Sequence, residues 1–212
     1  MNKFYCKGEK ARIDLVKKYE IVPISHIPLL KGQEKRSATG YTITKEYYCF
    51  SIKDKNSGNE PEMFIVGTFA AKHFLTLLKH DPLPIFHILK NNKENSKGQK
   101  NNSTSVEMDK WNSLALELYN IINIILIAWD TNGGILSKIM MNIIKNTNKE
   151  PTLADIRSIN TIISKDHKKR TIYQMLDEIK RQNEIKGFKF PLITKILSDN
   201  KIKNNITGEN NG

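Results

Sequence analysis

A change of pattern at a polar stretch in the middle of the chain constrains the fold more than any other feature. Residues 91–105, NNKENSKGQKNNSTS, contain no apolar side chain, and such a segment cannot offset the entropy cost of ordering it. Strand-like patterns precede this stretch and helical patterns follow it. We therefore expect an α+β protein. The predicted parts are a small β-rich N-terminal module with a hairpin and a helix (1–90), a polar linker or loop (91–105), an all-helical C-terminal module (106–200) and a frayed tail (201–212).

The N-terminal module has the features of a sheet with one proline-bearing edge. Residues 21–30 are apolar but include Pro23 and Pro28, and proline restricts a strand to the edge of a sheet because it cannot donate a ladder hydrogen bond. Residues 41–52 are rich in β-branched and aromatic side chains, and residues 62–66 form a short apolar run. The turn-forming residues between these two runs predict a β-hairpin.

Helical signals begin after the hairpin. The apolar spacing over residues 69–79 predicts an amphipathic helix with Thr68 as its N-cap. Gly67 and Thr68 also resemble a phosphate-binding turn, although a plain strand-to-helix turn has the same sequence. In the second half the pattern predicts five helices, near residues 106–129, 134–146, 152–164, 168–184 and 190–199.

The positive charge of the chain is unevenly placed. Lys and Arg number 34 against 22 Asp and Glu, a net charge of +12. The excess lies in residues 1–100 and 151–212, whereas residues 101–150 are nearly neutral. Lysine-rich coding accounts for part of the total, but an unneutralised excess still attracts polyanions. Nucleic acid is the leading candidate partner, DNA ahead of RNA, and an acidic protein is the alternative.

The densest basic segment runs from Lys165 to Lys189, with eight Lys and Arg against four acids. Residues 171–182 within it alternate apolar and polar positions as an amphipathic helix does. Positive charge just before that helix opposes its dipole unless an anion lies there. We predict a nucleic-acid-binding surface from this segment together with two N-terminal cations: Lys165, Lys168, Lys169, Arg170, Tyr173, Gln174, Lys180, Arg181, Lys186, Lys189, Lys35 and Arg36.

About 40 residues around this segment resemble the recognition helix and wing of winged-helix DNA-binding domains. The residues that match the family's helix are Thr171, Ile172, Tyr173, Leu176, Glu178, Ile179 and Lys180, and residues 184–190 would form the wing. The resemblance implies that this helix lies in the major groove and that the wing meets the DNA backbone. It also implies DNA contacts from Lys168, Lys169, Arg170, Tyr173 and Gln174. An ordinary amphipathic helix packed on the core has the same pattern.

A second surface is suggested by aromatic residues on the predicted hairpin, Tyr41, Tyr47, Tyr48 and Phe50, near Lys35 and Arg36. Single-strand binders combine stacking rings with cations in this way. The competing interpretation places these rings in the core of the sheet. Because strand side chains alternate between faces, we expect some of these rings to remain exposed.

Catalytic and metal-binding motifs are weak in this chain. Four acid-x-Lys pairs occur, at Asp166, Glu178, Glu184 and Asp199, which is close to the number expected by chance. These pairs alone do not indicate a nuclease, and a metal-dependent nuclease is kept as a third alternative. Cys6 and Cys49 lack the short spacings of a zinc site or a disulfide framework. We assign no catalytic residue, metal ligand or cofactor and lean towards a non-enzymatic protein, regulatory or encoded by a mobile element.

The longest apolar stretch, residues 111–129, includes Asn112, Glu117, Asn120 and Asn123, so we expect a buried core helix and no membrane span. The N-terminal residues lack the apolar region of a signal peptide. We therefore expect a cytoplasmic protein, and its oligomeric state is left open.

Overall fold

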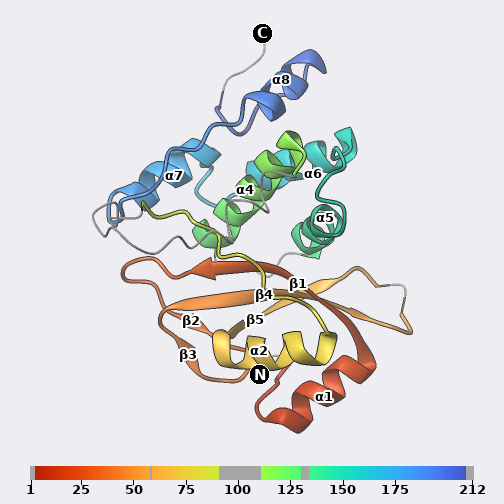
Figure 1. The fold of residues 1–212 in the computed structure, drawn as a ribbon. Helices are drawn as coiled ribbons and strands as arrows, with labels where there is room; N and C mark the ends of the chain where they lie inside the picture. The colour runs from red at the N-terminus through yellow and green to blue at the C-terminus, as the bar shows by residue number, and fades with distance from the viewer. Residues whose placement is uncertain (1–2, 58, 91–110, 130–133, 209–212) are drawn as a thin grey trace, which may run out of the picture. The chain divides into compact units, whose positions relative to one another are not determined.

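The computed structural model describes residues 3–57, 59–90, 111–129 and 134–208 and shows an α+β fold (Figure 1). Two compact units make up the chain. The N-terminal unit contains residues 1–86 and 131–142, and the C-terminal unit contains residues 87–130 and 143–212. The predicted linker, residues 91–105, lies outside the described residues.

A three-stranded antiparallel sheet in the order β1-β4-β5 forms the centre of the N-terminal unit. Its strands are β1 (Tyr19–Pro28), β4 (Glu46–Asp54) and β5 (Glu62–Gly67). The predicted β4–β5 hairpin and the edge position of the proline-bearing strand are both confirmed. The register of β1 against β4 shifts between Pro23 and Ser25, where proline cannot donate to the ladder. Between β1 and β4 in the sequence, β2 (Lys35–Arg36) and β3 (Thr42–Ile43) pair with each other as a second, two-stranded antiparallel sheet.

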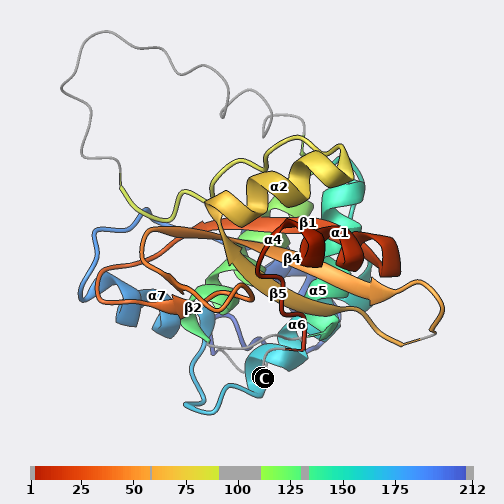
Figure 2. The ribbon, with the colours of Figure 1, turned by 90° about the horizontal axis from the view of Figure 1, so that it is seen from below.

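Two helices, α1 (Glu9–Lys18) and α2 (Thr68–Leu78), cover one face of this sheet (Figures 1 and 2). Phe50 of β4, Phe64 of β5 and Phe74 of α2 form the centre of the core, with ring centroids 5.3 to 5.4 Å apart. The α1 helix was not predicted, because its charged sequence EKARIDLVKK buries little apolar surface and lacks a side-chain cap.

Helix α5 (Gly134–Lys145) contributes residues 134–142 to the N-terminal unit. The Ser137 hydroxyl donates to the Glu62 carbonyl at 3.2 Å, and the Lys138 ammonium lies 2.9 Å from the Glu60 carboxylate. The assignment of these residues to the helical module is therefore wrong. Local sequence pattern identifies the helix but not the unit on which it packs.

The C-terminal unit is built around α4 (Ser113–Ala128), which contacts three further helices. Asn112 caps α4 by accepting hydrogen bonds from the backbone N–H groups of Leu114 and Ala115, and residues 121–127 are all buried. The three helices around it are α6 (Leu153–Ser164), α7 (Ile172–Lys180) and α8 (Pro191–Asp199). The predicted helices are confirmed apart from their ends, except that residues 106–110 lie outside the described residues.

The tail is wrongly predicted to fray over its described part, residues 201–208. The buried Asn160 side chain donates to the Lys203 carbonyl and accepts from the Asn205 backbone N–H, at 2.8 and 2.9 Å. Ile206 is buried as well. These contacts offset the ordering entropy that a polar segment alone would not. Among the described residues, no helix is long and apolar enough to cross a membrane.

Candidate functional site

Arg170, one of the predicted DNA contacts, is buried in the C-terminal unit. Its Nε and Nη2 donate to the two oxygens of the Asp166 carboxylate, each at 2.9 Å, and its Nη1 donates to Glu178. The backbone N–H of Arg170 also donates to Asp166. The hydrogen bonds from Arg170 lower the pKa of Asp166 to about 2. Arg170 is therefore corrected from a DNA contact to a structural ion pair, because a phosphate would have to displace both carboxylates.

Tyr173 and Gln174 also have structural contacts. The Gln174 side-chain oxygen accepts from the Thr171 backbone N–H at 2.8 Å, and the Thr171 hydroxyl accepts from the Gln174 N–H, which completes a capping box for α7. The Tyr173 ring packs against Phe190 with centroids 5.9 Å apart. Gln174 is exposed and Tyr173 half-buried, so the start of α7 is organised mainly by its own capping contacts.

The seven remaining cations of the segment are all exposed: Lys165, Lys168, Lys169, Lys180, Arg181, Lys186 and Lys189. We call this group the α7 basic cluster. Three of its members precede α7, two lie at its C-terminal end and two follow it. Lys168 contacts Glu178 at 3.4 Å. Apart from the buried Arg170–Asp166 pair, the segment contains seven basic side chains and three carboxylates.

The predicted wing has backbone partners within the C-terminal unit. Ile185 forms an antiparallel bridge with Leu89, the Lys90 N–H donates to the Glu184 carbonyl, and the Lys186 N–H donates to the Ile88 carbonyl. These bonds hold the segment that carries Lys186 in an extended conformation. The ammonium group of Lys186 remains exposed.

Lys35 and Arg36 form β2 in the N-terminal unit and are therefore not part of the α7 basic cluster. The Lys35 ammonium lies 5.8 Å from the centroid of the Tyr47 ring, and Arg36 is exposed. The expectation that some of the hairpin rings remain exposed is met by Tyr41, which is 62% exposed. Tyr47, Tyr48 and Phe50 are all buried, because side chains on both faces of the central strand β4 are buried.

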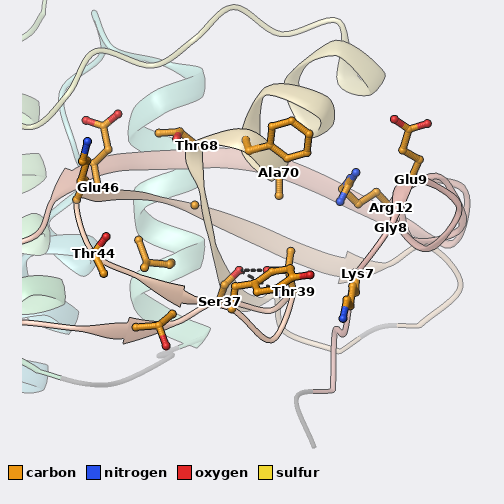
Figure 3. A pocket seen from close by; sticks show the side chains of 16 residues that line it. Lys7, Gly8, Glu9, Arg12, Ser37, Thr39, Thr44, Glu46, Thr68 and Ala70 are labelled. Atoms are coloured by element: carbon orange, nitrogen blue, oxygen red, sulfur yellow. Dashed lines mark hydrogen bonds between the residues drawn. The ribbon is translucent and has the colours of Figure 1, made fainter.

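A pocket of about 640 Å³ opens in the N-terminal unit beside the beginnings of α1 and α2 (Figure 3). Its lining includes Arg12 from α1 and the residues Thr68 to Ala70 from α2. The loop residues Ser37 and Thr39 lie across from them and are buried. The Thr39 hydroxyl and backbone N–H both donate to the Ser37 hydroxyl, at 2.8 and 3.1 Å.

Arg12 is the buried cation of this pocket, with 5% of the residue exposed. Its Nε donates to His73 Nδ1 at 2.7 Å, and its Nη1 donates to the Cys6 carbonyl at 3.3 Å. Neither partner is a carboxylate. No carboxylate among the described residues forms an ion pair with Arg12.

The sequence did not identify Arg12, Ser37 or Thr39 as site residues, because Arg12 lies far from the other two in the chain and none of them belongs to a motif. Among the lining residues, the sequence had suggested a ligand contact for Tyr41, as a stacking ring, and for Gly67 and Thr68, whose phosphate-binding-turn interpretation stays a prediction. The N-cap of α2 is Gly67 and not the predicted Thr68, and no side chain caps this helix.

Within the part of the chain that the structure describes, no three His, Cys, Asp or Glu side chains lie close enough together to hold a metal ion. Two of the acid-x-Lys carboxylates, those of Asp166 and Glu178, bind Arg170. Cys6 and Cys49 are buried free thiols, and burial raises the pKa of Cys6 to about 11 and that of Cys49 to about 12.

Comparison with known proteins matches the chain to a protein family. A family model described as "Uncharacterised conserved protein UCP028583" matches residues 5–203. Neither a curated protein nor a solved structure matches the chain. The family match spans both units.

Proposed function

We propose that this chain, which belongs to that family of uncharacterised conserved proteins, is a non-enzymatic nucleic-acid-binding protein. The proposal rests on the surface of the chain itself. The observation that carries the proposal is the α7 basic cluster, in which seven exposed cations occupy one short segment. Lysine and arginine bind nucleic-acid phosphates and release counterions, a contribution that is independent of sequence and sensitive to salt.

The internal pairing of Arg170 supports a charged surface that is available to ligands. Asp166, just before α7, and Glu178, within it, both bind Arg170. Lys165 and Lys169 therefore have no described ion-pair partner. An external polyanion is the ligand that complements such a surface.

We propose DNA as the nucleic acid, on the resemblance of residues 171–190 to a winged-helix recognition helix and wing. The described contacts shift the expected interface away from Arg170 and towards the lysines on either side of α7. The two buried free thiols fit a reducing compartment, in keeping with a cytoplasmic site of action.

A binding titration tests this proposal. Fluorescence anisotropy with labelled double-stranded DNA, single-stranded DNA and RNA at about 50 and 200 mM salt should show binding that weakens at least tenfold at the higher salt. The absence of binding at low salt would reject the proposal. Equally tight binding to polyglutamate would assign the cluster to an acidic protein partner, and cleavage of the DNA in Mg²⁺ would indicate a nuclease.

A further inference from the structure

The pocket of the N-terminal unit contains a buried positive charge without a counter-ion. Besides its bonds to His73 and the Cys6 carbonyl, the guanidinium of Arg12 has a terminal nitrogen, Nη2, with no hydrogen-bond acceptor among the described residues. Burying a charge without a partner is costly. Figure 3 shows Arg12 extending from α1 towards Ala70 at the beginning of α2.

The two carboxylates in the lining do not neutralise Arg12. Glu9 is exposed and points outward in Figure 3, and Glu46 lies at the other end of the pocket, where it contacts His26 Nε2 at 3.5 Å. A ligand that enters the pocket would therefore meet Arg12 without displacing an ion pair.

Two helices begin at this pocket, and neither has a side-chain cap. Gly8 is the N-cap of α1 and Gly67 the N-cap of α2, and both line the pocket. Gly8 has a φ of 85°, a conformation that favours glycine. The first N–H groups of a helix lack internal acceptors and carry partial positive charge, so two helix beginnings beside a buried arginine favour an anion.

Two exposed aromatic side chains line the pocket. Phe69, in the first turn of α2, is 82% exposed, and Tyr41 is 62% exposed, with the Lys7 ammonium 5.1 Å from its ring centroid. Exposed rings beside cations are suited to stacking with nucleobases. The volume of about 640 Å³ lies within the range of small-molecule pockets.

We infer that this pocket binds the phosphomonoester of a nucleotide, with the phosphate between Arg12 and the two helix beginnings and the base stacked on Phe69. A monoester carries close to two negative charges at neutral pH, which matches the site better than the single charge of a phosphodiester. The same group occurs on a free nucleotide and at the phosphorylated end of a nucleic acid. Only the second source rests on the proposed function.

The test compares three probes: thymidine 5′-monophosphate, a short oligothymidylate with a 5′-phosphate, and the same oligomer with a 5′-hydroxyl. We expect the monophosphate to bind by calorimetry and the phosphorylated oligomer to bind at least tenfold tighter than the hydroxyl form. Equal affinity for both oligomers with no binding of the monophosphate would overturn the inference and leave the proposed function intact. Binding of the monophosphate without binding of either oligomer would support the pocket with a free nucleotide as its ligand, and the titration with double-stranded DNA would decide the proposed function separately.

Variants separate the two halves of the site. Phe69→Ala removes an exposed ring that the fold does not need, and should weaken the monophosphate about tenfold while inorganic phosphate still competes. Arg12→Met should abolish both the binding of the monophosphate and the competition by inorganic phosphate. Thermal unfolding checks that this variant folds. Lys72→Gln removes one positive charge, as Arg12→Met does, from a position on α2 outside the pocket lining. It should leave the affinity for the monophosphate unchanged. If Phe69→Ala and Lys72→Gln bind the monophosphate equally well, the inference is wrong even if Arg12→Met fails to fold.

Discussion

Arg12 and Arg170 are both buried, but their charges are balanced differently. Arg170 lies between the carboxylates of Asp166 and Glu178, and Asp166 is itself buried. Arg12 donates to an imidazole nitrogen and a backbone carbonyl and has no described ion pair. A buried arginine with carboxylate partners stabilises its own fold, whereas one without them is suited to an external anion. This difference separates a structural residue from a candidate ligand-binding residue.

Asp166→Ala should destabilise the protein by about 3 kcal/mol, because it leaves the buried guanidinium of Arg170 with only one carboxylate. The exposed Asp177→Ala in α7 is the matched control and should change the free energy of unfolding by less than about 0.5 kcal/mol. Urea unfolding at neutral pH measures both values. Equal effects of the two substitutions would contradict a structural role for the Asp166–Arg170 pair.

The Asp166–Arg170 pair should also make the free energy of unfolding depend on pH in the acidic range. The folded pKa of Asp166 is lowered to about 2, below the ordinary value of about 3.9, so its contribution is present above about pH 4 and is lost as the pH falls towards 2. Asp166→Asn should abolish this part of the decline in unfolding free energy.

At the scale of elements, the beginnings of the helices differ in how their N–H groups are satisfied. Asn112, Thr152 and Thr171 cap α4, α6 and α7 from adjacent sequence. The N–H groups of Leu192 and Ile193 in α8 instead donate to the Glu117 carboxylate of α4, at 3.1 and 3.0 Å. Local caps can be recognised in the sequence, whereas a cap 75 residues away cannot.

Glu117→Ala should destabilise the protein by about 1 kcal/mol, since the first turn of α8 loses its acceptor. Burial raises the pKa of Glu117, so the neutral isostere Glu117→Gln avoids the cost of desolvating a charge and should lose less. Thermal unfolding of both variants measures the difference. A larger loss for the glutamine variant would show that the negative charge, and not the acceptor oxygen, holds α8.

The sequence predicted the elements whose side-chain pattern is local. The hairpin, the edge strand and the helices of the C-terminal unit follow from apolar spacing and caps. It missed α1, whose ten residues are mostly polar, and strand alternation did not predict that all three rings of β4 are buried, because it assumes that one face of the strand is open. The pocket was not predictable as a whole, because Arg12, Ser37 and Phe69 are brought together only by packing of α1 and α2 on one sheet face.

At the scale of the whole molecule, the net charge of +12 matters less than its placement. The structure separates the predicted binding residues between two units, with Lys35 and Arg36 in one and the α7 basic cluster in the other. A nucleic-acid site confined to the C-terminal unit would use that cluster and not Lys35 or Arg36. If total charge alone produced binding, any equal loss of lysines would have the same effect.

The most direct measurement compares two triple variants with equal charge in DNA-binding titrations over a range of salt. The first, Lys165→Gln, Lys169→Gln and Lys186→Gln, removes exposed members of the α7 basic cluster, and the control, Lys149→Gln, Lys195→Gln and Lys203→Gln, removes exposed lysines of the same unit outside it. The cluster variant should bind at least tenfold more weakly than the wild type, with the slope of log affinity against log salt reduced by about 2.7, or roughly 0.9 for each lost phosphate contact. The control should retain the affinity and slope of the wild type, and equal losses in both variants would contradict binding by this cluster.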